Sequence, residues 1–213
     1  MSALCASPLR RPAPTPRVHR RVRRDSMPAA TRVAIVGSGL AGLAAALEVA
    51  ETGGEAVVFE TAASLGGNSV KASSGLSAVT PESGDDAASF ESDFLRAAGG
   101  EGANCNPEHV RDLVQSSEDA LRFLARHGVL LPSLTQCGGH SHVRTHKNAA
   151  GPNVGVAIMS PLVERARAHP GITIRSSCRV TRVLRDEACG GGCGAVCGAV
   201  SYTHLTLPTK RIV

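Results

Sequence analysis

Six consecutive residues, Gly37-Ser38-Gly39-Leu40-Ala41-Gly42, carry the spacing G-x-G-x-x-G. In this spacing Gly37 allows a sharp turn, Gly39 leaves room for a pyrophosphate beside the backbone, and Gly42 allows close packing of a helix on a strand. A helix that begins here adds free amides and partial positive charge for phosphates. Further along, Glu60 offers a carboxylate to a ribose hydroxyl. Together these residues predict a dinucleotide-binding site.

A strand, a helix and a second strand are needed to position these groups. Thr31–Val36 is a short apolar, β-branched run that predicts the first strand. An Ala- and Leu-rich stretch follows the glycines and predicts a helix that ends at Gly53-Gly54. Ala56–Glu60 predicts the second strand. A glycine turn in an ordinary α/β protein is the alternative, and the agreement of strand, spacing and acid disfavours it.

A second glycine pair, Gly66-Gly67, follows Glu60 closely. A site for NAD alone does not require glycines at this point. The pair suits a longer dinucleotide whose second half crosses the next loop.

Two stretches resemble a known family. Val33–Ala78 (VAIVGSGLAGLAAALEVAETGGEAVVFETAASLGGNSVKASSGLSA) and Leu134–Gly155 (LTQCGGHSHVRTHKNAAGPNVG) resemble the flavin domain of soluble FAD-dependent fumarate reductases, a group related to succinate dehydrogenase flavoproteins and L-aspartate oxidase. The similarity covers about Thr31–Val200. It implies an α/β fold, a Rossmann-like FAD-binding domain of the glutathione-reductase type with an inserted β-meander.

The resemblance also implies roles for single residues. The pyrophosphate of FAD would lie against the glycine loop, Glu60 would hold the adenosine ribose, a loop of small polar residues would lead to the flavin ring, and one backbone position would meet the adenine. In that order these residues are Gly37, Gly39, Leu40, Ala41, Gly42, Glu60, Gly67, Asn68, Ser69, Ser73, Ser74, Gly75 and Val180. In membrane-bound relatives a histidine near this loop bonds covalently to the flavin. Asn68 stands at about that position, so we expect FAD to be held non-covalently.

By resemblance the activity is that of an oxidoreductase. Reduced flavin would pass a hydride to the double bond of fumarate, a small dicarboxylate, giving succinate. The family's catalytic groups lie in a capping domain and C-terminal part that this sequence lacks, so we assign no catalytic residue and expect the chain alone to be inactive. The alternatives are a fragment of an L-aspartate oxidase or 3-ketosteroid dehydrogenase, or a non-catalytic FAD-binding module. The electron donor stays open.

The GGHS segment is followed by Arg144, which could face the flavin or a substrate carboxylate, be solvated, or serve the fold; a structural role is favoured at even odds. The resemblance places Thr145 and His146 with it beside the flavin. Histidines 140, 142 and 146 have no spacing of a tetrahedral zinc site, so we predict no metal. Elsewhere we expect helices over 87–98, 107–127 and 153–169 and strands over 171–175, 179–184 and 194–200, the last two forming a hairpin.

The two ends differ in composition from the body of the chain. The chain has a net charge of +5, yet residues 1–24 hold seven arginines and no acid, and the remainder has 16 basic against 18 acidic residues. A nucleic-acid partner is therefore disfavoured, and no apolar run is long enough for a membrane span. Residues 1–30 predict a transit peptide for a mitochondrion or plastid. Alternatives are a disordered tail without an address, or a start at Met27 and a cytoplasmic protein.

The domain organisation follows from these boundaries. Residues 31–200 are the N-terminal part of the FAD-binding domain. Residues 201–213 resemble a translated sequencing adaptor, with a genuine divergent C-terminus as the alternative.

Overall fold

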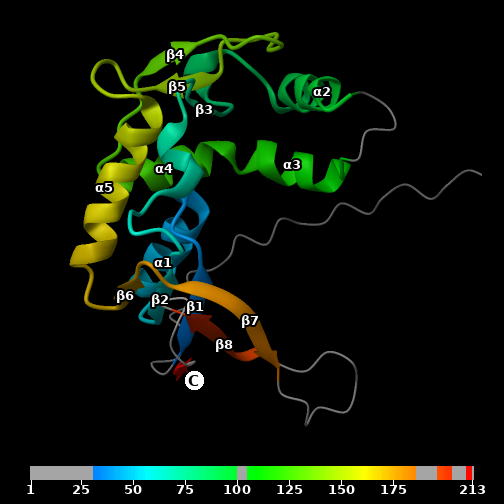
Figure 1. The fold of residues 1–213 in the computed structure, drawn as a ribbon. Helices are drawn as coiled ribbons and strands as arrows, with labels where there is room; N and C mark the ends of the chain where they lie inside the picture. The colour runs from blue at the N-terminus through cyan, green and yellow to red at the C-terminus, as the bar shows by residue number, and fades with distance from the viewer. Residues whose placement is uncertain (1–30, 100–104, 186–195, 203–209, 213) are drawn as a thin grey trace, which may run out of the picture.

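The structure of the protein is a computed structural model, and it describes residues 31–99, 105–185, 196–202 and 210–212. Figure 1 shows the arrangement. The predicted leader, residues 1–30, lies outside the described residues, as do residues 186–195 between the two strands of the predicted hairpin.

A parallel sheet of three strands forms the base of the fold. Its strands are β1 (Arg32–Val36), β2 (Glu55–Phe59) and β6 (Ile172–Arg175), in the order β1-β2-β6. Val58 of β2 pairs with Ile35 of β1 on one side and with Ile174 of β6 on the other. Such β-branched, apolar strands suit a sheet buried under helices. The first two strands confirm the sequence prediction to within one residue.

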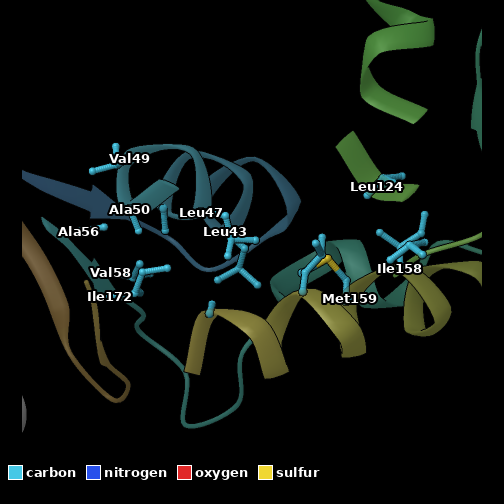
Figure 2. Close-up of a cluster of buried hydrophobic side chains, with 14 of the residues drawn as sticks. Leu43, Leu47, Val49, Ala50, Ala56, Val58, Leu124, Ile158, Met159 and Ile172 are labelled. Carbon is cyan, nitrogen blue, oxygen red and sulfur yellow. The ribbon is translucent and has the colours of Figure 1, made fainter. Parts of the chain in front are cut away.

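Two helices cover one face of this sheet. They are α1 (Leu40–Glu51) and α5 (Val154–Ala168). Figure 2 shows Leu43 and Leu47 of α1, Val58 of the sheet and Met159 of α5 in one apolar cluster. All four side chains are at most 2% exposed. Burying a leucine, valine or methionine contributes about 1.5–3 kcal/mol, so this cluster fixes the helices on the strands.

Helix α5 is continuous through Pro161. A proline at this point of a helix favours a kink or a second helix start. Proline removes one backbone hydrogen bond, but the helix is held from its first turn to its last by buried side chains, among them Val154 and Ala166. In Figure 1 α5 runs from the small upper sheet down to β6.

The upper sheet is antiparallel and short. It consists of β3 (Leu76–Ser77), β5 (Thr145–Lys147) and β4 (Ser133–Thr135), in the order β3-β5-β4. The 3-10 helix η1 (Gly67–Lys71) leads into it. The 3-10 helix η2 (Pro81–Ser83) and α2 (Ala87–Ala97) follow β3.

The single helix expected over residues 107–127 is in fact two. Helix α3 (Pro107–Gln115) ends at Ser116, and α4 (Ser117–Arg126) begins at once. Ser117 explains the break, because its Oγ donates to the carbonyl of Val114 and accepts from the amide of Val79. A serine that bonds to nearby backbone competes with the helix. Gly128 follows α4 with φ +84°, the conformation of a C-terminal glycine cap.

The β-meander predicted near the C-terminus is present. Strands β7 (Arg179–Arg185) and β8 (Val196–Tyr202) form an antiparallel pair, and β9 (Lys210–Ile212) pairs with β8. Whether residues 201–213 are foreign stays a prediction. Within the described residues, every helix is too short or too polar to cross a bilayer.

Candidate functional site: a glycine cradle at the strand ends

Two positions in the loop between β1 and α1 require glycine because of the backbone conformation or the close packing there. Gly37 has φ +97°, a conformation that strains other residues, and its amide donates to the carbonyl of Phe59 at 2.8 Å. A Cβ on Gly42 would overlap the carbonyl of Gly37. Both glycines are therefore needed for the loop and helix to pack, as the sequence predicted.

Gly39 has no such local requirement. Its backbone is extended, with φ −67° and ψ −177°. An added Cβ would meet only Ser69 Oγ at 3.4 Å and the Gly66 carbonyl at 4.0 Å, which are ordinary contacts. The protein itself would accept a side chain here. A glycine at this position therefore fits a ligand that approaches the backbone, which is the fit expected of a pyrophosphate.

The amides at the start of α1 lie beside Gly39. Leu40 N donates to Ser69 Oγ at 3.1 Å, and Leu43 N donates to the carbonyl of Gly39 at 3.0 Å. Among the described residues, the amides of Ala41 and Gly42 donate to no acceptor outside the helix. Helix-starting amides of this kind are suited to bind an anion.

Glu60 follows β2 and is bound to the same loop. Its Oε2 accepts from Ser38 N at 2.9 Å and from Ser38 Oγ at 2.6 Å, and its Oε1 accepts from Ala62 N at 2.8 Å. Burial raises the pKa of this half-buried carboxyl, but the hydrogen bonds from Ala62 and Ser38 outweigh burial and hold the pKa below its ordinary value. Glu60 is therefore held as an anion beside the loop, where the sequence predicts a ribose acceptor.

A third strand end reaches the same edge. After β6, Ser177 N donates to the carbonyl of Ala62 at 3.0 Å, and Cys178 N donates to the carbonyl of Glu60 at 2.8 Å. Val180 lies two residues further on, half-buried in β7. The predicted adenine contact thus follows closely on a segment that is bonded to the carboxyl end of β2, the edge at which dinucleotides bind in such sheets.

The second glycine pair completes a backbone cradle, by which we mean residues 37–42 together with residues 66–69. Gly66 N donates to Ser38 Oγ at 3.1 Å. Gly67 has φ +52°, and a Cβ on it would lie 3.9 Å from the Cα of Gly39. Two bare backbones therefore face each other. Asn68 is exposed at the first turn of η1, and Ser69 is half-buried.

The loop beyond the cradle is supported by α5 and by the upper sheet. Gly155 N donates to the carbonyl of Ala72 at 2.8 Å, and a Cβ on Gly155 would lie 2.6 Å from the carbonyl of Val70. Gly75 has φ +150° and lies against the backbone of His146. Ser73 and Ser74 are exposed between these two supports. We had assigned no role to Gly155, although the sequence places it at a helix start.

Arg144 serves the fold rather than a solvent-exposed site. Its side chain is fully buried, with Nε 2.5 Å from Asp85 Oδ2 and Nη1 2.5 Å from Asp93 Oδ2. Its guanidinium also lies 4.7 Å from the centre of the Phe90 ring. Burial lowers the pKa of Arg144, but hydrogen bonds to Asp85 and Asp93 outweigh it, so the net shift is upward. The idea of a solvated arginine is wrong, because two buried acids hold the side chain.

The hydrogen bonds of Asp93 complete this buried cluster. The amide of Ser141 donates to Asp93 at 2.7 Å, and this bond is the main reason that the pKa of Asp93 lies far below its usual range. Burial opposes the shift, and Ser141 Oγ and Arg144 reinforce it. The GGHS segment is thereby attached to α2. Nothing in the sequence pairs Asp85 and Asp93 with Arg144, since the contacts are distant along the chain.

A metal site and a cavity are the other features considered as candidate sites. Among the described residues, no three His, Cys, Asp or Glu side chains converge as metal ligands. A cavity of about 230 Å³ lies at the C-terminal end of α1, where Glu51, His127, Arg165 and His169 line it. That end of the helix is opposite to the glycine cradle.

Comparisons with known proteins give a family match over most of the chain. Residues 32–210 match a family model described as an FAD binding domain. An NADH:fumarate oxidoreductase of Klebsiella pneumoniae is 33% identical over 174 residues, which are 78% of this chain and 18% of that protein. An L-aspartate oxidase of Vibrio cholerae is 30% identical over 184 residues, or 81% of this chain and 33% of that protein.

A solved structure gives the corresponding match in three dimensions. The open conformation of a flavocytochrome c3 fumarate reductase has a TM-score of 0.72 and 27% identity, and the match covers 81% of this chain and 30% of that one. The chain spans at most about a third of the length of these three proteins. The α/β architecture with its meander is therefore the one that the sequence predicted.

Proposed function

The chain belongs to the FAD-binding-domain family, and on this basis we propose that it is the FAD-binding part of a fumarate reductase-like oxidoreductase. The supporting observation is Gly39, a glycine that no protein contact requires, facing Gly67 across a cradle of bare backbone. A side chain would fill the space that the diphosphate of FAD needs. The proposal is tested by adding FAD to the full chain and measuring its uptake through the quenching of flavin fluorescence.

The cradle and the residues around it would each contact a different part of the dinucleotide. The amides of Ala41 and Gly42 would bind the diphosphate, and the Glu60 carboxylate would accept from the adenosine ribose. The loop from Gly67 to Gly75 would lead to the ring, and Val180 would meet the adenine through its backbone. Bound there, the flavin supplies hydride chemistry for reducing the double bond of a small dicarboxylate.

The cofactor is held without a covalent bond in this proposal. Asn68 is exposed at the start of η1, at about the position where the family resemblance implies the flavin-linked histidine of membrane-bound proteins. A neutral amide forms hydrogen bonds but no such link.

The substrate separates two candidate functions. The likenesses to the NADH:fumarate oxidoreductase and to the flavocytochrome c3 fumarate reductase support fumarate as the substrate, while the L-aspartate oxidase likeness supports oxidation of L-aspartate. The two are distinguished on a polypeptide continued past Val200 in the genomic reading frame. Anaerobic reoxidation of its reduced flavin by fumarate would support the first, and reduction of its oxidised flavin by L-aspartate would support the second.

Residues 1–30 are proposed to direct the protein to a mitochondrion or plastid. The support is the cluster of seven arginines without an acid in residues 1–24. Fusion of residues 1–30 to a fluorescent protein tests this, and diffuse fluorescence would oppose it.

A further inference from the structure

Ser38 lies inside the glycine loop, yet its side chain makes directed contacts that a loop residue does not need. The side chain is 0% exposed. Its Oγ lies 2.6 Å from Glu60 Oε2 and 3.1 Å from the amide of Gly66. An amide can only donate, and an ionised carboxylate can only accept. The hydroxyl therefore accepts from Gly66 and donates to Glu60.

The hydroxyl is the one contact to Glu60 that depends on the residue type at position 38. The other donors, the backbone amides of Ser38, Thr61 and Ala62, are groups that almost any residue would supply. Glu60 is only half-buried and has a flexible side chain, so its direction depends on these bonds. A bond to a charged acceptor is stronger than one between neutral groups.

We propose that Ser38 is a positioning residue, whose hydroxyl aims the Glu60 carboxylate at a ribose hydroxyl of the adenine dinucleotide. The inference rests on the proposed function, because it takes the ligand to be FAD. Ser38 touches no part of the ligand in this account. It acts through Glu60, and it ties the direction of that carboxylate to the position of the Gly66-Gly67 turn.

The structure indicates that Ser38→Ala will fold. Gly66 N retains the backbone carbonyl of Ser38 as an acceptor at 3.2 Å, and Glu60 Oε2 retains Ser38 N. No buried group therefore loses its last partner. Ser64→Ala is a matched control, since Ser64 is exposed in the segment between Glu60 and Gly66.

The test uses the full chain and three competitors that displace FAD: ADP, 2′-deoxy-ADP and 3′-deoxy-ADP. We expect the native protein and Ser64→Ala to prefer ADP over at least one deoxy compound by about tenfold, the worth of one hydrogen bond to a charged group. In Ser38→Ala this preference should fall below about threefold. Loss of loop shape alone would weaken all three ligands equally and leave the preference unchanged, which would overturn the proposal.

A second measurement isolates the path through Glu60. In a Glu60→Gln background, Ser38→Ala should change the affinity for FAD by less than about twofold, because contacting residues are not additive. An equal loss in both backgrounds would show that Ser38 does not act through Glu60. A native chain that takes up FAD but shows no preference among the competitors would refute the contact between Glu60 and the ribose, and the proposed FAD-binding function would stand. A chain that takes up no FAD would refute both the ribose contact and the proposed function.

Discussion

Gly42 lies so close to Gly37 that a Cβ on Gly42 would overlap the Gly37 carbonyl, whereas Gly39 between them has room for one. Gly42→Ala should therefore lower the free energy of unfolding by about 1–3 kcal/mol, the usual cost of overpacking. Chemical denaturation of the purified variant measures this. An unchanged stability would contradict the close packing of α1 on β1.

Gly39→Ala, unlike Gly42→Ala, should leave the stability of the fold nearly unchanged but reduce FAD binding. Its extended backbone accepts alanine, so we expect the free energy of unfolding to stay within about 0.5 kcal/mol. Uptake of FAD should fall sharply, and the larger Gly39→Val should abolish it, because a side chain occupies the place of the diphosphate. Flavin absorbance of the purified variants gives the result. Full uptake by either variant would place the diphosphate elsewhere.

Glu60→Gln should weaken FAD binding about tenfold at neutral pH, the value of a hydrogen bond to a charged acceptor. The pKa of Glu60 is lowered from an ordinary value of 4.5, so the contribution of its carboxylate to folding is complete above that value. It is lost as the pH falls through the lowered pKa. Titration of stability from pH 7 downwards should show this loss in the native chain. The same loss in Glu60→Gln would assign it to another acid.

Ser69→Ala should lower the free energy of unfolding by about 1 kcal/mol, because Ser69 Oγ caps the first amide of α1. The cap comes from a distant loop, so the variant should also loosen η1. Thermal unfolding measures the first effect and hydrogen exchange the second. Ser64→Ala, an exposed serine nearby, is the control and should stay within about 0.5 kcal/mol. Equal stabilities of the two variants would refute the cap.

Asp93→Asn should cost about 3–5 kcal/mol, because removing one partner leaves Arg144 buried with less compensation. The pKa of Asp93 is strongly lowered, so its carboxylate stabilises the fold fully above the ordinary value of 3.8. That stabilisation falls as the pH drops below 3.8. The difference in the free energy of unfolding between the native protein and Asp93→Asn should therefore become smaller as the pH falls below 3.8. Asp119→Asn is the control: its ion pair with Arg122 is exposed and should matter by less than about 1 kcal/mol.

Acid precipitation should release the flavin from the holoprotein into the supernatant, because Asn68 cannot form a covalent link. The absorbance spectrum of the two fractions checks this. Flavin that stays in the pellet, and remains after washing with denaturant, would show a covalent bond.

The parts of the fold that could be predicted are those with local causes. The β1-α1-β2 unit follows from the spacing of Gly37, Gly39 and Gly42 and from apolar runs on either side. The break at Ser116 was missed because it depends on Ser117 receiving a hydrogen bond from Val79, far away in the chain. A periodic apolar pattern continues unchanged across that point.

In the candidate site, too, features with local causes could be predicted and those that depend on distant contacts could not. Glu60 was identified from its place after a strand, but its contact with Ser38 was not, because a serine between two glycines gives no sign of the direction of its hydroxyl. Gly155 was missed for a similar reason. Its need for a bare backbone arises from Val70 and Ala72.

The contact between Gly155 and Ala72 has a consequence for how the protein is synthesised. A ribosome completes the loop that includes Ala72 long before it reaches Gly155, and β6, the neighbour of β2, emerges later still. Contacts between distant segments form slowly. The loop around Ala72 therefore gains its contact with Gly155 only after α5 has emerged and docked.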